Sequence, residues 1–311
     1  MNTIHTVFFG THDLATTVLQ TLIDAPNIAV DLVITQPDRP VGRKKIVTPP
    51  PVKILAEKYG IPILQPSSLK ELEISDWKFE VATLAEYGLM IPERIINAFS
   101  KGILNVHPSL LPKYRGATPI QSAIKNGDEQ AGVSIMLLEK TMDTGPLLAQ
   151  KTYTLDPDEM YTHTNRTLAQ LGARLLVDTL PTYISGDITP TPQDNKQATY
   201  CSQLTRDDGR VDWNSAARDI YNQYRAFSPW PGVWTMWDKK RLKLLNISLS
   251  KMALPPGCAH VEDDILTIGT SGGAIQVHEL QLEGKKPMDA KTFVNGCSTH
   301  VTQTFRFDSQ A

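Results

Sequence analysis

The chain has 311 residues, of which 41% are hydrophobic and 21% charged, and its formal net charge is −2. This composition is that of an ordinary globular protein with enough residues for two domains, and it excludes an intrinsically disordered chain. The small negative charge argues against indiscriminate nucleic-acid binding, which depends on a large positive excess, so any contact with RNA has to be local.

In the first half of the chain, short apolar runs alternate with segments of helical periodicity. Alternating strands and helices imply right-handed crossovers and a mostly parallel sheet covered on both faces. The sequence therefore predicts a Rossmann-like α/β domain. The expected strands are 4–9, 28–35, 61–64, 79–85, 102–106 and 132–138, and the expected helices include 13–24, 52–59 and 92–99.

The pattern changes in the second half. A long helical pattern at 162–184 is followed by turn formers and prolines, which predict an extended linker over 187–205. Beyond it, short strands bounded by turns predict a small β-barrel domain. The expected domains are thus 1–186 and 206–311. The expected strands of the second domain are 233–237, 242–248, 259–261, 265–268 and 275–282.

The cysteines and the amino-terminal residues indicate the cellular compartment in which the protein is expected. Cys201, Cys258 and Cys297 are widely spaced and form no C-x-x-C pair, which predicts reduced thiols rather than a disulfide framework or a zinc site. Residues 1–5 carry no basic signal region, and no window approaches about 18 uninterrupted apolar residues. We therefore expect a cytoplasmic protein with no membrane contact and no metal site.

Two polar residues stand at the end of the expected strand 102–106. Asn105 and His107 are two positions apart, so their side chains point to the same face of the sheet. If the sheet is parallel, this is the end at which open α/β sheets bind ligands. The alternative is that the pair merely terminates a strand, because Pro108 cannot continue the ladder.

A carboxylate stands at a comparable place after the expected strand 132–138. Asp143 lies on a tight turn that Gly145 permits. An amide, an imidazole and a carboxylate at strand ends suit a reaction with a developing oxyanion and a proton to move. Asn105, His107 and Asp143 are therefore the candidate catalytic residues.

Longer stretches around these residues resemble a known family. NVHPSLLPKYRGATP at 105–119, followed by MDTGP at 142–146, resembles the signature of folate-dependent formyltransferases. Other segments resemble the methionyl-tRNA formyltransferases along nearly the whole chain; these are 35–45, 51–66, 86–92, 225–232 and 281–296. The resemblance implies an α/β Rossmann-like domain followed by a small OB-like β-barrel domain that binds tRNA.

The resemblance also implies an activity. The formyl group of 10-formyltetrahydrofolate would pass to the amino group of methionine on initiator methionyl-tRNA, for translation initiation and without a metal. Asn105 and His107 would donate hydrogen bonds to the oxyanion, and Asp143 would orient His107 or accept a proton. The division of proton transfer between His107 and Asp143 stays open. The implied folate-binding residues are Ser109, Leu110, Leu111, Pro112, Tyr87, Gly88 and Leu89.

The segment 36–50 is the candidate tRNA contact. A connection of about 15 residues is long for an α/β unit and favours a functional interpretation over that of a solvated basic loop. The resemblance implies that it enters the acceptor-stem end of the tRNA, with Arg43 at its main basic position, and that the protein is a monomer. The implied tRNA-binding residues are Arg39, Arg43, Lys44, Lys45 and Arg206.

Two other functions remain open at this stage. One is a formyltransferase acting on an amino sugar nucleotide, which would be insensitive to charge reversal at Arg43. The other is a non-catalytic RNA-binding relative, which would have no turnover to lose on substitution of Asn105 or Asp143.

Overall fold

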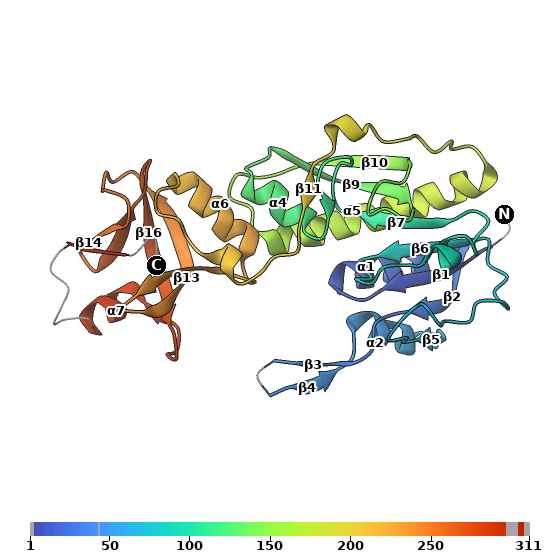
Figure 1. Cartoon of the computed structure of the whole chain (residues 1–311), viewed down its shortest axis with the longest axis horizontal. Helices are drawn as coiled ribbons and strands as arrows, with labels where there is room; N and C mark the ends of the chain where they lie inside the picture. Colours follow the sequence, from blue (N-terminus) through green and yellow to red (C-terminus); the bar gives the residue numbers. More distant parts are fainter. Residues whose placement is uncertain (1–2, 43, 297–303, 308–311) are drawn as a thin grey trace. The chain divides into compact units, whose positions relative to one another are not determined.

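The computed structural model describes residues 3–42, 44–296 and 304–307 (Figure 1). Contacts between residues divide the chain into two compact units. The first comprises Met1–Pro119, Gln130–Thr154 and Thr164–Cys201, and the second comprises Ile120–Glu129, Leu155–His163 and Ser202–Ala311. The domain boundaries expected from the sequence, at 186 and 206, stay a prediction.

The first unit is built on a seven-stranded sheet in the order β10-β9-β7-β6-β1-β2-β5. The prediction of a mostly parallel sheet is confirmed, since the pairs among β5, β2, β1, β6 and β7 are all parallel. Strand β9 pairs antiparallel with both β7 and β10, so it alone runs opposite to the other strands. The strands are β1 (Ile4–Gly10), β2 (Ile28–Ile34), β5 (Ile63–Leu64), β6 (Val81–Ala85), β7 (Ile103–His107), β9 (Gln130–Leu137) and β10 (Leu147–Thr154).

The helices that cover this sheet have apolar side chains at every third or fourth position, so that one face of each helix is apolar. In α1 the side chains of Leu14, Val18 and Leu22 recur every four residues and are buried. Helix α5 lies directly on β7, because an ideal Cβ at Gly172 would be only 2.6 Å from Cγ1 of Val106. The helices of the first unit are α1 (Asp13–Asp24), α2 (Pro51–Lys58), α3 (Glu93–Ile96) and most of α5 (Tyr161–Ser185), whereas α4 (Pro119–Lys125) belongs almost entirely to the second unit.

The second unit contains an antiparallel sheet in the order β12-β13-β16-β15-β14-β18, with β17 paired to β16. The expected small β domain is confirmed, and all the described strand pairs of its sheet are antiparallel. The described pairings form a path from β12 to β18 with no pairing between these two strands, as in a partly open barrel. The elements are α6 (Ala217–Phe227), β12 (Val233–Trp237), β13 (Lys240–Ser250), β14 (Cys258–Glu262), β15 (Ile265–Gly269), β16 (Ala274–Leu282), β17 (Met288–Asp289), α7 (Ala290–Gly296) and β18 (Thr304–Arg306).

Several short elements lie outside the two sheets. The expected tRNA segment forms a hairpin of β3 (Arg39–Val41) and β4 (Ile46–Thr48), drawn in blue in Figure 1. Within the expected linker, β11 (Tyr200–Cys201) pairs in parallel with β8 (Arg115–Gly116) of the first unit. Two 3₁₀ turns complete the description, η1 (Asn195–Gln197) and η2 (Asp207–Gly209). None of the described helices is both long and apolar enough to cross a membrane.

The core of the second unit is organised around Trp213, which is fully buried. Its indole Nε1 donates a hydrogen bond to Oγ1 of Thr235 (3.1 Å), and its ring lies 6.2 Å from that of Phe307. We expect Trp213→Ala to lower the free energy of unfolding of this unit by about 3–5 kcal/mol, because a large buried ring leaves a cavity. Denaturant titration measures this loss. The control Trp230→Ala removes a ring that is 54% exposed and should cost less than about 0.5 kcal/mol.

Candidate active site

Asn105 and His107 lie at the carboxyl end of β7, near the middle of the first unit's sheet. Strand β7 pairs with β6 on one side and β9 on the other, and all five of its residues are buried. As whole residues, Asn105 and His107 are only 6% and 5% exposed. In the described part of the chain, the side-chain amide of Asn105 makes no hydrogen bond, so its NH₂ group is available to a ligand.

Asp143 is brought next to His107 by the turn between β9 and β10. Oδ1 of Asp143 lies 3.8 Å from Nδ1 of His107, and the two side chains are 11% and 6% exposed. Oδ2 of Asp143 accepts a hydrogen bond from the backbone N–H of Gly116 (2.8 Å). Asp143 itself has a φ of 54°, a left-handed conformation that is uncommon for a residue other than glycine.

The imidazole of His107 has its second nitrogen engaged by the backbone. Nε2 lies 3.0 Å from the carbonyl oxygen of Tyr114. A carbonyl oxygen only accepts, so Nε2 carries the proton in this contact and Nδ1 is the nitrogen that faces Asp143. The backbone at 114–116 therefore holds both members of the pair.

The segment 109–112 is fixed against β9 and β10 by two polar side chains that the sequence analysis did not identify. Oγ of Ser134 donates to the carbonyl oxygen of Ser109 (2.6 Å) and accepts from the backbone N–H of Leu111 (3.1 Å). Nε2 of Gln150 donates to Oγ of Ser134 and to the carbonyl oxygen of Leu111, both at 2.9 Å. Ser109 and Leu111 are buried, whereas Leu110 and Pro112 are half-buried.

Ser134 stands out in the sequence as a polar residue within the apolar run of β9. This strand reads QAGVSIML from Gln130 to Leu137, and Ser134 is fully buried. Buried hydroxyls normally have hydrogen-bond partners, so this position could have been identified from the pattern as one that binds a neighbouring loop.

In the loop 86–89, the side chain of Tyr87 lies in the core rather than on the surface. It is 1% exposed, and its ring packs edge-on against Phe9. The carbonyl oxygen of Tyr87 accepts hydrogen bonds from Oγ1 of Thr11 and Nε2 of Gln36, both at 2.8 Å. Gly88 has a φ of +80°, which strains any side-chain-bearing residue, and an ideal Cβ there would be 2.6 Å from Nε2 of Gln36 and would displace that amide. Leu89 is half-buried.

Glu86 joins this loop to the start of α1. Its carboxylate accepts a hydrogen bond from the backbone N–H of Leu14 (3.3 Å). Although the residue as a whole is exposed, desolvation of the carboxyl group against α1 raises the pKa of Glu86 to about 7, and the hydrogen bonds from Leu14 and Ala15 act in the opposite direction.

The β3–β4 hairpin displays most of the expected tRNA-binding residues. Arg39, Lys44 and Lys45 are exposed on it, whereas Arg43 lies outside the described residues. The base of the hairpin is anchored through Asp38, whose carboxylate accepts hydrogen bonds from Gln65 (2.8 Å) and Lys53 (2.9 and 3.0 Å). These hydrogen bonds lower the pKa of Asp38, and the one from Gln65 has the largest effect.

The remaining expected tRNA residue belongs to the second unit. Arg206 is exposed, and its carbonyl oxygen accepts a hydrogen bond from Nε1 of Trp234 (2.9 Å). The ring of Trp234 lies 5.8 Å from the guanidinium of Arg210 and 4.2 Å from that of Arg241. Arg206 therefore lies beside two further arginines that stack on one indole.

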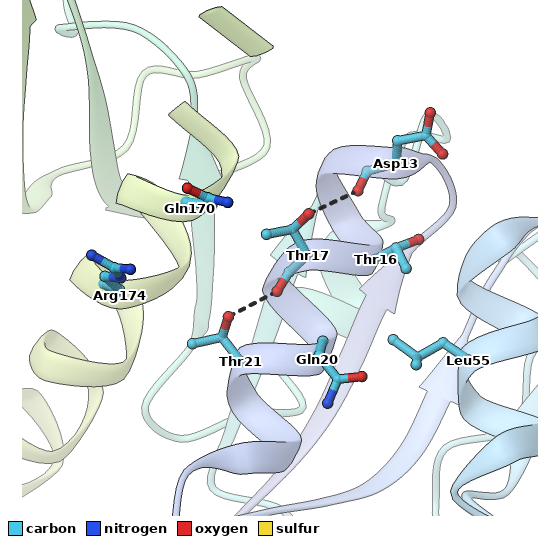
Figure 2. Close-up of a pocket in the computed structure, with 8 residues that line it drawn as sticks. All are labelled: Asp13, Thr16, Thr17, Gln20, Thr21, Leu55, Gln170 and Arg174. Carbon is cyan, nitrogen blue, oxygen red and sulfur yellow. Dashed lines mark hydrogen bonds between the residues drawn. The ribbon is translucent and has the colours of Figure 1, made fainter. Parts of the chain in front are cut away.

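A separate cavity of about 460 Å³ lies on the helical face of the first unit (Figure 2). Threonine hydroxyls of α1 in this cavity donate hydrogen bonds to the backbone of the same helix. For example, Oγ1 of Thr21 donates to the carbonyl oxygen of Thr17 (2.9 Å). None of the expected site residues lines this cavity. Its lining residues are Asp13, Thr16, Thr17, Gln20, Thr21, Leu55, Gln170 and Arg174. Among the described residues, no three His, Cys, Asp or Glu side chains are arranged to hold a metal ion.

Comparison with family models assigns both halves of the chain. Residues 2–180 match the formyl transferase family, and residues 203–298 match the formyl transferase C-terminal domain. Among solved structures, an N-formyltransferase from Helicobacter canadensis in complex with folinic acid and dTDP-3-aminofucose is similar, with a TM-score of 0.66, 17% identity, and coverage of 88% of this chain and 98% of that one. HypX from Aquifex aeolicus in complex with tetrahydrofolic acid has a TM-score of 0.63 at 18% identity, covering 95% and 48%. At such identity these two likenesses show the fold alone.

Curated relatives are much more similar in sequence. The methionyl-tRNA formyltransferase of Desulforamulus reducens is 40% identical over 299 residues, covering 93% of this chain and 94% of the relative. The enzyme of Dehalococcoides mccartyi is 40% identical over 303 residues, covering 95% of this chain and 96% of the relative. That of Staphylococcus aureus is 38% identical over 298 residues, covering 93% of this chain and 95% of the relative. The chain therefore belongs to the formyl transferase family, and within that family its relatives at about 40% identity are methionyl-tRNA formyltransferases.

Proposed function

We propose that this protein transfers the formyl group of 10-formyltetrahydrofolate to the amino group of methionine on initiator methionyl-tRNA. The observation that carries the proposal is the similarity to methionyl-tRNA formyltransferases over nearly the whole length of both chains. The protein is an enzyme of formyl transfer, and its place is translation initiation. A cytoplasmic location and a monomeric state go with this function.

The reaction needs one proton acceptor and one oxyanion donor. The amine nitrogen attacks the formyl carbon, a C–N bond forms, and the carbonyl oxygen becomes negative while the nitrogen becomes positive. The bond from the carbon to N10 of the folate then breaks, and N10 takes a proton as tetrahydrofolate leaves. A buried amide with no hydrogen-bond partner among the described residues, as at Asn105, suits the oxyanion.

His107 and Asp143 suit the proton transfer. The ionised carboxylate of Asp143 only accepts hydrogen bonds, so it serves as the proton acceptor, directly or through His107. With Nε2 of His107 held by Tyr114, the nitrogen that can exchange a proton is Nδ1, which faces Asp143 at 3.8 Å. We assign to this pair the transfer of the proton from the amine to the leaving group.

The folate would be held by the exposed parts of two loops. Leu110 and Pro112, which are half-buried, offer apolar surface, whereas Ser109 and Leu111 support the loop from inside. In the second loop we assign Gly88 and Leu89 to the ligand. Tyr87 contributes its backbone, because its ring lies in the core.

The acceptor tRNA would meet the β3–β4 hairpin and Arg206. Exposed lysines act as point charges toward phosphates, and arginines make forked contacts. We assign Arg39, Arg43, Lys44 and Lys45 to this role. Arg43 rests on the sequence resemblance alone, because it lies outside the described residues.

The test of the proposal is an acceptor competition. Purified protein with 10-formyltetrahydrofolate and no added metal is offered charged initiator tRNA or a UDP-amino sugar. Formylmethionyl-tRNA as the preferred product is the expected result. Preference for the sugar would assign the chain to the sugar-nucleotide enzymes, and tRNA binding without turnover would assign it to the non-catalytic relatives.

Charge reversal on the hairpin tests the tRNA assignment. We expect the double variant Lys44→Glu/Lys45→Glu to raise KM for tRNA by about tenfold or more, because each lost phosphate contact removes about one released counterion. The KM for folate and kcat at saturating tRNA should stay unchanged. Steady-state kinetics at several salt concentrations measure both effects.

The matched control is Lys78→Glu, which reverses an exposed charge outside the hairpin. If the hairpin and control variants change KM for tRNA and its salt dependence equally, the hairpin has no special part in tRNA binding.

A further inference from the structure

The segment that follows α5 lies against the loops that hold His107 and Asp143. We call residues 191–201 the strap. At its start, Thr191 and Leu147 exchange two backbone hydrogen bonds of 2.8 Å each. At its end, β11 pairs with β8, so that Tyr200 is opposite Arg115 and Cys201 opposite Gly116. The strap therefore contacts both the strand after the Asp143 turn and the backbone beside His107.

Between these two attachments, Gln193 binds the Asp143 turn directly. Its Nε2 donates to the carbonyl oxygens of Asp143 (2.9 Å) and Gly145 (2.7 Å). Its Oε1 accepts from Nε (3.1 Å) and Nη2 (2.7 Å) of Arg115. All the hydrogen-bonding capacity of the amide thus goes to the residues around Asp143. These donors stabilise a turn in which Asp143 has the left-handed φ of 54°.

Arg115 connects this contact to the carboxylate of Asp143. The guanidinium is 2% exposed, and its Nη2 also donates to Oδ1 of Asn195 in the strap (2.8 Å). In the described part of the chain, no carboxylate pairs with it, so neutral amides of the strap satisfy a buried cation. The next residue, Gly116, donates its N–H to Oδ2 of Asp143.

The strap also fits tightly against the backbone at 114–116. An ideal Cβ at Gly116, where φ is +126°, would be 2.0 Å from the carbonyl oxygen of Cys201, so only glycine fits there. Oγ1 of Thr199 accepts from the backbone N–H of Tyr114 (2.8 Å), the residue whose carbonyl oxygen binds His107. The strap thus contacts Tyr114 and Gly116, the two residues whose backbone groups bind His107 and Asp143.

We propose that Gln193 is a positioning residue of the formyl transfer, which holds the Asp143 turn so that the carboxylate faces His107. The inference rests on the proposed function and adds a residue of the strap to it. Gln193 touches no reacting atom, so its removal should slow the chemical step through Asp143 and leave substrate binding intact.

Glutamate is the sharpest replacement at this position. In Gln193→Glu the carboxylate still accepts from Arg115, which keeps the buried guanidinium satisfied, but it cannot donate to the carbonyl oxygens of Asp143 and Gly145. A second variant, Gln193→Met, has similar length and no strong hydrogen-bonding group. Matched controls are Gln197→Glu and Gln197→Met. Gln197 lies in the same strap and is exposed, and among the described residues its side chain binds only Asp194.

The experiment measures single-turnover formylation of methionyl-tRNA by wild type, the four variants, and the double variant Asp143→Asn/Gln193→Glu. We expect Gln193→Glu and Gln193→Met to lower the single-turnover rate about 10- to 100-fold, because an acid–base group that is misplaced loses part of its contribution. In steady-state kinetics, the KM for each substrate should stay within about twofold of wild type. In the Asp143→Asn background the same change should add less than about twofold, because Gln193 acts through Asp143. The controls should match wild type.

A measurement independent of activity accompanies the kinetics. Hydrogen exchange at the amide of Gly116, which donates to Asp143, should be faster in Gln193→Glu than in Gln197→Glu, while the melting temperatures of the two variants stay alike.

The inference is overturned if the Gln193 variants keep the wild-type rate, or if their rate loss adds fully to that of Asp143→Asn. In either case, an active wild type still supports the proposed function. An inactive wild type would overturn the proposed function and the inference with it.

Discussion

Asp143→Asn is expected to lower the single-turnover rate of formyl transfer by about 10²- to 10⁴-fold, the usual contribution of a positioned acid–base group. The replacement keeps an oxygen that can accept the N–H of Gly116, so the turn should hold its shape. It removes the negative charge that faces Nδ1 of His107. Rapid-quench measurement with both substrates saturating isolates this chemical step from binding.

The control for this variant is Asp187→Asn. Asp187 is exposed and contacts Oγ of Ser185, away from the strand ends that carry the site. Its replacement should leave the rate unchanged. If Asp143→Asn weakens binding of either substrate but leaves the single-turnover rate at the wild-type value, the carboxylate has no part in proton transfer.

Asn105→Ala is expected to lower the same rate by about 10²- to 10³-fold, the effect of removing one donor from an oxyanion site. The amide of Asn105 makes no hydrogen bond in the described chain, so its removal breaks no existing contact and the fold should tolerate it. The loss should appear in kcat, because the donor is needed when the oxygen becomes negative.

Asn97→Ala provides the comparison, since Asn97 is an exposed residue at the end of α3. Melting temperatures of both variants confirm that they are folded. A wild-type kcat in folded Asn105→Ala would show that another group stabilises the oxyanion.

Most of the first unit's sheet could be predicted from the sequence because its strands are buried and apolar. The direction of β9 and the existence of β10 could not. An apolar run such as 132–138 does not show whether a strand is parallel or antiparallel. None of the residues of β10 is fully buried, so its sequence lacks the apolar run that predicts a strand.

Helix α6 carries a helical apolar pattern in the sequence. Ala217, Ile220, Tyr224 and Phe227 recur at helical spacing and are all buried. The helix also buries Arg225, whose Nη1 donates to the carbonyl oxygen of Glu159 (2.9 Å). Buried polar side chains of this kind obscure the apolar pattern, because their burial depends on partners that lie far away in the sequence.

Within the site, the convergence of His107 and Asp143 could be predicted because the sheet orders strand ends. The surroundings of the pair could not. The side chain of Tyr87 lies in the core, although the sequence resemblance predicts that its loop binds folate. Gln193 lies in a segment that the sequence predicts as a linker, yet it binds the Asp143 turn. A hydrogen bond between residues 50 positions apart leaves no periodic trace in a sequence.

The sequence by itself determined the family, the α/β class of the first unit, and the amide, imidazole and carboxylate at its strand ends. These depend on residue type and local periodicity, which the linear order of the chain contains. Only the tertiary structure decided which nitrogen of His107 faces Asp143, and that Gln193 and Gly116 hold the carboxylate in place. Those contacts arise from the packing of distant segments, where hydrogen-bond geometry within a few tenths of an ångström determines which atoms pair.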